Sequence, residues 1–268
     1  IVAELEKWYI FPNRYKAIAD RCAELQSELS EAVEQIKAGI PERPRGWNKR
    51  ANEQWSKRRS RLTNSLVATS VQLSVLTPIM FESFIGLITA VLMRPNVRRN
   101  RRLADAFRRS ALDVKIYDLA TRCQGFARPI EESNPIMRRY WSVVNERNDI
   151  VHGNVDPVRD VLEVVYFKGK TPIFPKGGDA IEEFFDSLIK QYAPEKVHKN
   201  YLLAHELIIE ILNHMIVPVK NSMLTLMDDS QPGWDDKRGK SGMLFPDFVG
   251  SFHLPGTRYD TDLRPSAQ

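Results

Sequence analysis

One apolar run, from residue 66 to residue 93, limits the folds open to this chain more than any other segment. It reads LVATSVQLSVLTPIMFESFIGLITAVLM and is long enough to cross a lipid bilayer as a helix. Gln72, Pro78 and Glu82 interrupt it, together with several serines and threonines, and polar groups of this kind are costly inside a membrane. We therefore expect a helix buried at the centre of a helical bundle, without any association with a membrane.

Helical periodicity recurs along most of the remaining chain. Glycine contributes only 13 of 268 residues, which also favours helix over sheet. Residues 17–37 place six apolar side chains on one helix face, namely Ile18, Cys22, Leu25, Leu29, Val33 and Ile36. The other helical segments are 51–93 with a break or kink at Pro78, 101–122, the stretch that starts at Pro135, 177–192, and 194–227 with a kink at Pro218. The expected fold class is mainly all-α.

One segment departs from the helical pattern. The stretch DVLEVVYFKGKTPIF, residues 160–174, is rich in β-branched and aromatic residues around a Gly-Lys pair, which predicts a small β-hairpin inserted between helices. The chain is then expected to comprise an N-terminal helical extension with a basic loop (1–59), a helical bundle (60–227) and an extended C-terminal tail (228–268). In the tail, Phe245, Phe248 and Phe252 are expected to dock on a neighbouring surface.

The formal net charge of +5 is small, so its distribution matters more than its size. The excess of Arg and Lys is concentrated in residues 43–61 and 94–109. Such segments can neutralise the phosphates of RNA, and Trp47 and Trp55 of the first can stack on bases. The alternative is that both are solvated faces without a ligand. The candidate RNA-binding residues are Lys57, Arg58, Arg59, Arg98, Arg99, Arg101 and Arg102.

Several common chemistries leave no signature in the sequence, which contains no P-loop, no glycine-rich dinucleotide motif, no GxSxG and no HExxH. Cys22 and Cys123 belong to no CxxC pair, so we expect reduced, part-buried thiols. His205 and His214 lie on the last helix and are each expected to be isolated, at the surface or part-buried. Neither a metal nor a cofactor is expected. Reduced thiols, with no leader sequence after Ile1, favour a cytoplasmic location.

The stretch NERNDIVHGN, residues 145–154, ends a helix with polar side chains in close succession. Asn148 and His152 are one turn apart and face the same side of that helix, and the long stem of Arg147 allows its guanidinium to reach this side. Gly153 suits the left-handed residue that closes a helix, which places His152 in the last turn. There the negative end of the helix dipole favours a protonated imidazole.

These residue types suit the cleavage of RNA without a metal. His152 is expected to remove the proton from a 2′-hydroxyl, which attacks the adjacent phosphate. Arg147 is expected to hold that phosphate and to stabilise the added negative charge. The products are a 2′,3′-cyclic phosphate and a 5′-hydroxyl. The same spacing also fits an ordinary polar helix end, whose side chains only cap and stabilise the helix.

The heptad RNDIVHG resembles the signature of the HEPN superfamily, an arginine followed by a polar residue and, after four to six residues, by a histidine. Its context is similar too, with LTPIMFESFIGLI before it and YLLAHELIIEILNHM after it. The resemblance covers residues 60–225 and implies a HEPN-like helical bundle. It makes Arg147, Asn148 and His152 catalytic and Asp149 a supporting residue. Glu82 resembles an acid that some members keep on the preceding helix; alternatively, it is a buried acid paired with an arginine.

The resemblance also implies a function and partners. HEPN domains usually form homodimers in which two motif helices meet. Many are metal-independent endoribonucleases of toxin–antitoxin, phage-defence and CRISPR-associated systems. We therefore expect a hydrolase that cleaves single-stranded or tRNA-like RNA in antiviral defence or as a toxin, and that pairs with a second copy and with an antitoxin or sensor. Two alternatives stay open: a non-catalytic HEPN domain that binds RNA or nucleotides or serves as a sensor or assembly module, and a helical scaffold without an active site.

Overall fold

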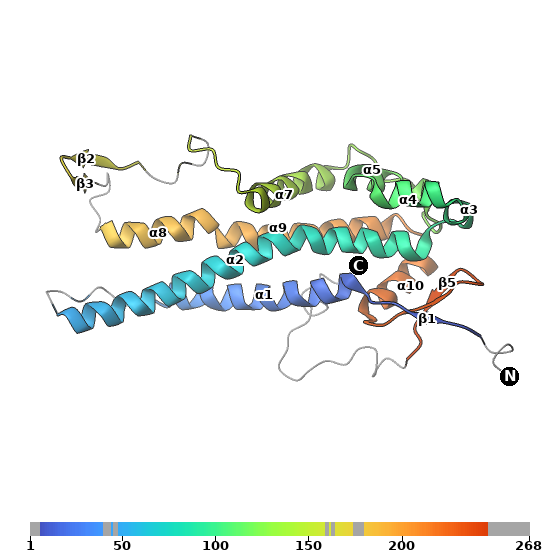
Figure 1. Cartoon of the computed structure of the whole chain (residues 1–268), viewed down its shortest axis with the longest axis horizontal. Helices are drawn as coiled ribbons and strands as arrows, with labels where there is room; N and C mark the ends of the chain where they lie inside the picture. Colours follow the sequence, from blue (N-terminus) through green and yellow to red (C-terminus); the bar gives the residue numbers. More distant parts are fainter. Residues whose placement is uncertain are drawn as a thin grey trace. The chain divides into compact units, whose positions relative to one another are not determined.

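Helices dominate the computed structural model of the chain, which describes residues 6–39, 44, 48–158, 161, 164–173 and 180–245 (Figure 1). The expected mainly all-α fold class is confirmed. The helices are α1 (Arg14–Lys37), α2 (Lys49–Leu92), α3 (Pro95–Arg99), α4 (Arg101–Arg109), α5 (Leu112–Tyr117), α6 (Leu119–Arg122), α7 (Pro135–His152), α8 (Ala180–Tyr192), α9 (Pro194–Asn213) and α10 (Val217–Asp228). The strands are β1 (Tyr9–Ile10), β2 (Tyr166–Lys168), β3 (Thr171–Ile173), β4 (Gly233–Asp235) and β5 (Lys240–Gly242).

The chain forms two compact units, and each is assembled from segments that are far apart in the sequence. The first unit comprises Ile1–Glu24, Leu76–Val143 and Leu202–Gln268, and the second comprises Leu25–Val75 and Val144–Tyr201. The boundaries fall inside α1, α2, α7 and α9. The units therefore do not follow the expected consecutive segments 1–59, 60–227 and 228–268, because long helices, rather than loops, pass from one unit to the other.

The second half of α2 forms the core of the first unit. Phe81 packs against Tyr140 of α7 with 4.7 Å between ring centroids, and Phe84 packs against Tyr15 of α1 at 5.7 Å. All four rings are buried, and aromatic side chains contribute the largest apolar areas to a core. Among the described helices, α2 alone is long and apolar enough to cross a membrane, but 56% of its apolar window is buried inside the structure. This burial is compatible with a soluble protein.

Of the break or kink expected at Pro78, the break is absent from α2. The helix runs without interruption from Lys49 to Leu92, and Pro78 lies buried inside it. Proline removes one backbone donor from a helix. Leu73 and Met80 on either side are fully buried, and their packing favours the continuous helix over the expected break.

The segment 101–122, expected to be one helix, is divided into α4, α5 and α6. Ser110 ends α4 in an extended conformation (φ −61°, ψ 155°), and its hydroxyl donates to Phe107 O at 2.8 Å. A serine side chain that bonds to the backbone in this way competes with continuation of the helix.

The last expected helix is also divided, into α9 and α10, instead of bending at Pro218. Ile216 N donates to Gly125 O, and Ala127 N donates to His214 O, each at 2.8 Å. The break is therefore fixed by backbone hydrogen bonds to a loop that is distant in the sequence.

Part of the expected extended tail forms a small sheet in the first unit. β4 and β5 pair antiparallel, and β1 adds the third strand, with Tyr9 opposite Trp234. The sheet thus joins the beginning of the described chain to its end. Phe245 is exposed, and Phe248 and Phe252 lie outside the described residues.

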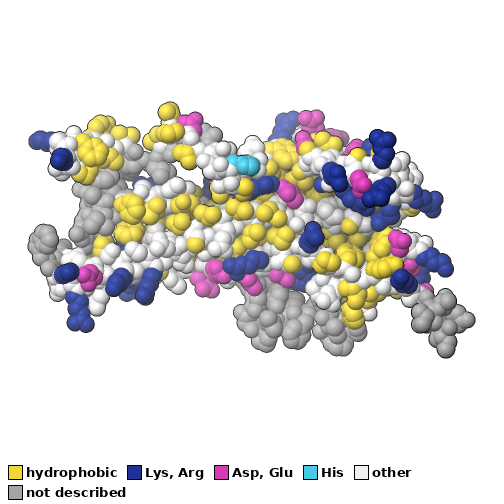
Figure 2. Space-filling view, viewed as in Figure 1, with side chains coloured by type: hydrophobic (Ala, Val, Ile, Leu, Met, Phe, Trp, Pro, Cys, Tyr) yellow, Lys and Arg dark blue, Asp and Glu magenta, His cyan; other side chains and the backbone are white. Residues whose placement is uncertain are grey.

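The hairpin expected after the motif helix is confirmed in the second unit. β2 and β3 pair antiparallel, with Tyr166 opposite Ile173 and Lys168 opposite Thr171. Gly169 makes the turn at φ +64°, a conformation that favours glycine. Both strands are exposed, and Figure 2 shows hydrophobic side chains gathered over them.

Candidate functional site

The motif lies at the C-terminal end of α7, whose start is set by its sequence. Asn134 Oδ1 accepts from Ile136 N at 2.9 Å, and Pro135 occupies the first helical position, where its missing N–H costs nothing. Met137 and Tyr140 are buried one turn apart. This packing orients the N-terminal half of α7 and leaves its last two turns for the motif.

A Schellman turn closes α7. Gly153 has a φ of +63°, its N–H donates to Ile150 O at 3.3 Å, and Asn154 N donates to Asp149 O at 2.9 Å. The prediction that Gly153 ends the helix in the left-handed conformation is confirmed. His152 is therefore the last helical residue, where the unpaired carbonyls of the helix end gather.

The motif side chains differ in exposure. Arg147, Asn148 and Asp149 are half-buried, whereas His152 is exposed. Asp149 Oδ1 accepts from Asn154 Nδ2 at 3.1 Å. Within the described part of the chain, neither Asn148 nor His152 makes a side-chain hydrogen bond, so both polar groups are available to a ligand.

Glu146 holds the motif end of α7 to α9 within the second unit. Its Oε2 accepts from Lys196 Nζ at 3.0 Å and from Asn200 Nδ2 at 3.3 Å. Sequence reasoning missed this group. Lys196 and Asn200 are one turn apart and so share a face of α9, but nothing in the sequence pairs that face with α7.

Glu82 belongs to the first unit, whereas the motif belongs to the second. Its side chain is half-buried and lines a pocket together with Tyr15 and Lys115. The described lining of this pocket contains no motif residue. The structure therefore does not place Glu82 in one pocket with Arg147 or His152.

The basic residues of α2 have unequal environments. Lys57 and Arg58 are exposed, but Arg59 is buried, pairs with Asp186 of α8 at 2.9 Å and lies over the ring of Phe185 at 5.2 Å. These contacts give Arg59 a structural role.

Trp55, one of the two tryptophans in the first basic segment, is not exposed to bind RNA. Trp55 is buried edge-on against Phe185, with 6.4 Å between ring centroids, so the prediction that it stacks on RNA bases is wrong. Packing against α8 removed this ring from solvent, which the sequence around it does not indicate. Trp47 lies outside the described residues.

The second basic segment lies in the first unit, where Figure 2 shows Lys and Arg side chains gathered over α3 and α4. Arg99, Arg101 and Arg102 are exposed. Arg98 is half-buried, with its guanidinium 4.2 Å from the ring centroid of Trp234. The exposed arginines can attract phosphates, but the structure does not bring them into one unit with the motif.

Two histidines and both cysteines are more buried than expected. His205 and His214 are 0% and 6% exposed, so they belong to the core rather than to the surface. His214 Nε2 lies 3.3 Å from Glu210 Oε1, one turn earlier. Cys22 and Cys123 are buried free thiols, and burial raises the pKa of Cys123 to about 12. A thiol with so high a pKa is a poor nucleophile.

Comparison with models of protein families, with curated proteins and with solved structures gives no match to this chain. Among the described residues, no group of three or more His, Cys, Asp and Glu side chains could hold a metal ion. A functional interpretation therefore depends on the geometry of α7 and on the residues that it carries.

Proposed function

We propose that this chain is a metal-independent endoribonuclease of the HEPN type, with Arg147, Asn148 and His152 in its active site. One observation carries the proposal: an exposed imidazole occupies the final turn of α7, on the same face as Asn148 one turn earlier. The Schellman turn at Gly153 and the contacts of Glu146 with α9 support this end of the helix. Such support matters because small displacements of catalytic groups cost large factors in rate.

In the proposed reaction, His152 Nε2 or Nδ1 removes the proton from a ribose 2′-hydroxyl. The 2′-oxygen forms a bond to the adjacent phosphorus, and the bond from phosphorus to the 5′-oxygen breaks. Arg147 stabilises the negative charge on the phosphorane, and Asn148 donates hydrogen bonds to the scissile group. The leaving 5′-oxygen takes its proton from an imidazolium, which a second copy of the chain supplies when two motif helices meet.

The proposed substrate is single-stranded or tRNA-like RNA. Lys57 and Arg58 are exposed and would neutralise backbone phosphates near the second unit, and Arg99, Arg101 and Arg102 would do so on the first. We further propose a cytoplasmic role in phage defence or as a toxin. A nuclease of this kind needs restraint by an antitoxin or a sensor.

Cleavage of labelled RNA in EDTA tests the proposal. The purified protein is incubated with a single-stranded RNA and with a tRNA pool, beside His152→Ala and Arg147→Ala. Each variant is expected to lower the cleavage rate about 10²–10⁴-fold, because each removes a group that acts only in the transition state. The wild-type products are expected to end in 2′,3′-cyclic phosphate.

His198→Gln provides the matched control. His198 is another exposed histidine of the second unit, on α9, and it lies outside the motif. Its variant is expected to cleave RNA at the wild-type rate, and circular dichroism checks that every variant is folded. Equal cleavage by wild type and His152→Ala would refute the proposed site.

The second candidate is a non-catalytic HEPN domain that binds RNA. The exposed basic side chains on α2, α3 and α4 favour this alternative, because they suit binding whether or not cleavage follows. RNA affinity is measured on the same wild-type and variant proteins. Binding that weakens steeply with salt, without any cleavage, would support the binding module over the nuclease.

A further inference from the structure

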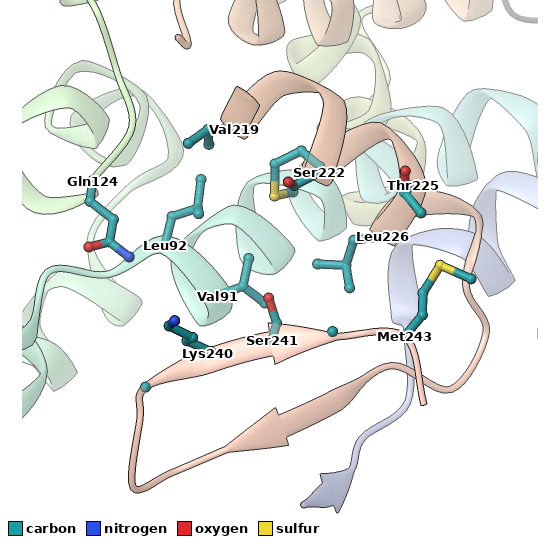
Figure 3. Close-up of a pocket in the computed structure, with 13 residues that line it drawn as sticks. Val91, Leu92, Gln124, Val219, Ser222, Thr225, Leu226, Lys240, Ser241 and Met243 are labelled. Atoms are coloured by element: carbon teal, nitrogen blue, oxygen red, sulfur yellow. The ribbon is translucent and has the colours of Figure 1, made fainter. Parts of the chain in front are cut away.

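Two pockets of the first unit adjoin each other beside β5. One, of about 430 Å³, is lined by α2, α10 and the end of the β4–β5 hairpin (Figure 3). The other, of about 380 Å³, is lined by α3 and the turn that precedes β5. They share Gln124 and Gly239 in their linings. Both volumes lie in the range of about 300–1,000 Å³ that small-molecule sites occupy.

Four cationic side chains line the smaller pocket. Arg98 and Arg99 come from α3, and Lys237 and Arg238 come from the turn between β4 and β5. Arg238 is paired with two acids, but Arg99 and Lys237 are exposed and form no ion pair with any described residue. Asp236 is the one acid among the described lining residues. The pocket thus retains positive charge that an anion would neutralise.

Arg98 of the smaller pocket is half-buried and makes two contacts that suit a cation. Its guanidinium stacks 4.2 Å from the ring centroid of Trp234, and its Nη2 donates to Ala90 O at 2.7 Å. Burial and, next, the charge of Arg108 lower the pKa of Arg98 from its ordinary value. A bound anion would offset both effects. The planar fork of arginine also matches the oxygens of a phosphate.

The larger pocket has a mainly apolar lining, to which Gln124, Lys240 and a few hydroxyls add polar groups. Val91 of α2 and Leu226 of α10 contribute to it, and Figure 3 shows their side chains above β5. Ser222 and Thr225 donate to backbone carbonyls four residues earlier, at 2.9 and 3.2 Å, so their oxygens remain as acceptors. This lining suits an apolar or aromatic body that carries a small number of polar atoms.

We propose that the two pockets together bind an organic phosphate. Its phosphate group would contact Arg98, Arg99 and Lys237, and its body would occupy the larger pocket. The continuity at Gln124 and Gly239 allows one molecule to reach both. Several cations around one pocket suit a dianion or polyphosphate better than a single carboxylate. The site contains no residue of the α7 motif, so it goes beyond the proposed ribonuclease, with which it shares only the exposed Arg99.

Isothermal titration calorimetry on the full chain tests this site with ATP, dihexanoyl phosphatidic acid and inorganic triphosphate. ATP or dihexanoyl phosphatidic acid is expected to bind more tightly than triphosphate. Comparison of ATP with the phosphatidic acid shows whether the larger pocket prefers a nucleoside or an acyl chain. The double variant Arg99→Gln/Lys237→Gln is expected to weaken that binding at least about tenfold, because charge-assisted hydrogen bonds are lost. Ser241→Tyr places a ring in the larger pocket and is expected to weaken only the organic phosphate.

Arg128→Gln/Arg138→Gln provides the matched control. Both arginines are exposed residues of the first unit, outside both linings, and the double variant removes the same charge. It is expected to change the affinity less than about twofold, since charges on the solvated surface are screened by salt. The proposal is overturned if neither organic phosphate binds more tightly than triphosphate. It is equally overturned if the control weakens binding as much as the lining variant does, which would indicate diffuse attraction.

Discussion

Asn13 makes a buried bridge between the start of α1 and the end of α10, and Asn13→Ala tests how much this bridge stabilises the first unit. Its Nδ2 donates to Leu226 O and to Asp229 O, each at 2.9 Å. Its Oδ1 accepts from Lys16 N at 3.1 Å, which caps α1. The residue is 3% exposed, so water does not readily replace these hydrogen bonds in the variant.

The cost of Asn13→Ala follows from those three hydrogen bonds. Loss of the cap costs about 1 kcal/mol. Each hydrogen bond that Nδ2 no longer donates leaves a buried carbonyl without this partner, which costs about 1 kcal/mol more. Leu226 O still accepts from Asp229 N at 3.3 Å, so losing the hydrogen bond to Leu226 O costs less than losing the one to Asp229 O. We expect the free energy of unfolding to fall by about 2–3 kcal/mol.

Urea unfolding followed by tryptophan fluorescence and circular dichroism measures this change. Asn100→Ala is the matched control, because Asn100 caps α4 through Leu103 N at 3.1 Å but is exposed. Its loss is expected to cost about 1 kcal/mol. If Asn13→Ala is no more destabilising than Asn100→Ala, the buried bridge contributes nothing beyond a helix cap, and the reasoning is refuted.

Asn13→Asp separates the cap from the two donors. The introduced carboxylate still accepts from Lys16 N, but its second oxygen faces the carbonyls of Leu226 and Asp229. Burial and these carbonyls raise the pKa of the introduced carboxyl above its unfolded value. The free energy of unfolding then falls as the pH rises from the unfolded pKa to the higher folded pKa, and it is recovered as the pH falls over the same interval. A deficit that does not change with pH would show that the carboxylate has moved away.

Two buried groups elsewhere give further predictions. Burial raises the pKa of Cys123 from 9.0 to about 12, so the thiolate fraction of the native protein is about 1,000-fold smaller than that of the unfolded chain. Labelling with Ellman's reagent at pH 8 is expected to be about 1,000-fold slower than in urea, and fast native labelling would contradict this. The contribution of this thiol to stability is present below pH 9.0 and is lost as the pH rises toward 12. Asp186→Asn is expected to cost about 1–2 kcal/mol in urea unfolding, because buried Arg59 loses its 2.9 Å ion pair. Arg59→Met is expected to cost less than Arg59→Ala, since its side chain still packs on Phe185, and equal costs would count against that packing.

Local signals predicted the helices well where one apolar face determines the packing. The run that contains Phe81 and Phe84 became the core of the first unit, and Gly153 closed α7 in the expected conformation. Both outcomes depend on residues within a few turns of each other. The same is true of the β2–β3 hairpin, whose turn needs only Gly169 and its neighbours.

Sequence reasoning failed where distant segments determine the backbone. The break between α9 and α10 depends on hydrogen bonds from Ile216 to Gly125 and from Ala127 to His214. No pattern inside residues 194–227 encodes those partners, so helical periodicity predicted one helix with a kink. The strand β4 was missed for the same reason, because it pairs with Tyr9–Ile10 at the other end of the described chain.

A basic segment in the sequence does not by itself show which of its side chains can bind an anionic partner, because the fold decides which of them are exposed. Arg58 and Arg59 are neighbours, yet one is exposed and the other is buried against Asp186. The candidate ribonuclease site has little of this difficulty, since one helix end supplies its residues, whereas the candidate phosphate site needs α3 and a turn far along the chain. The two proposals share Arg99, so only variants elsewhere separate them. His152→Ala is expected to abolish cleavage without changing the affinity for an organic phosphate. Lys237→Gln removes no proposed RNA contact, so loss of cleavage in this variant would show that the two sites are coupled.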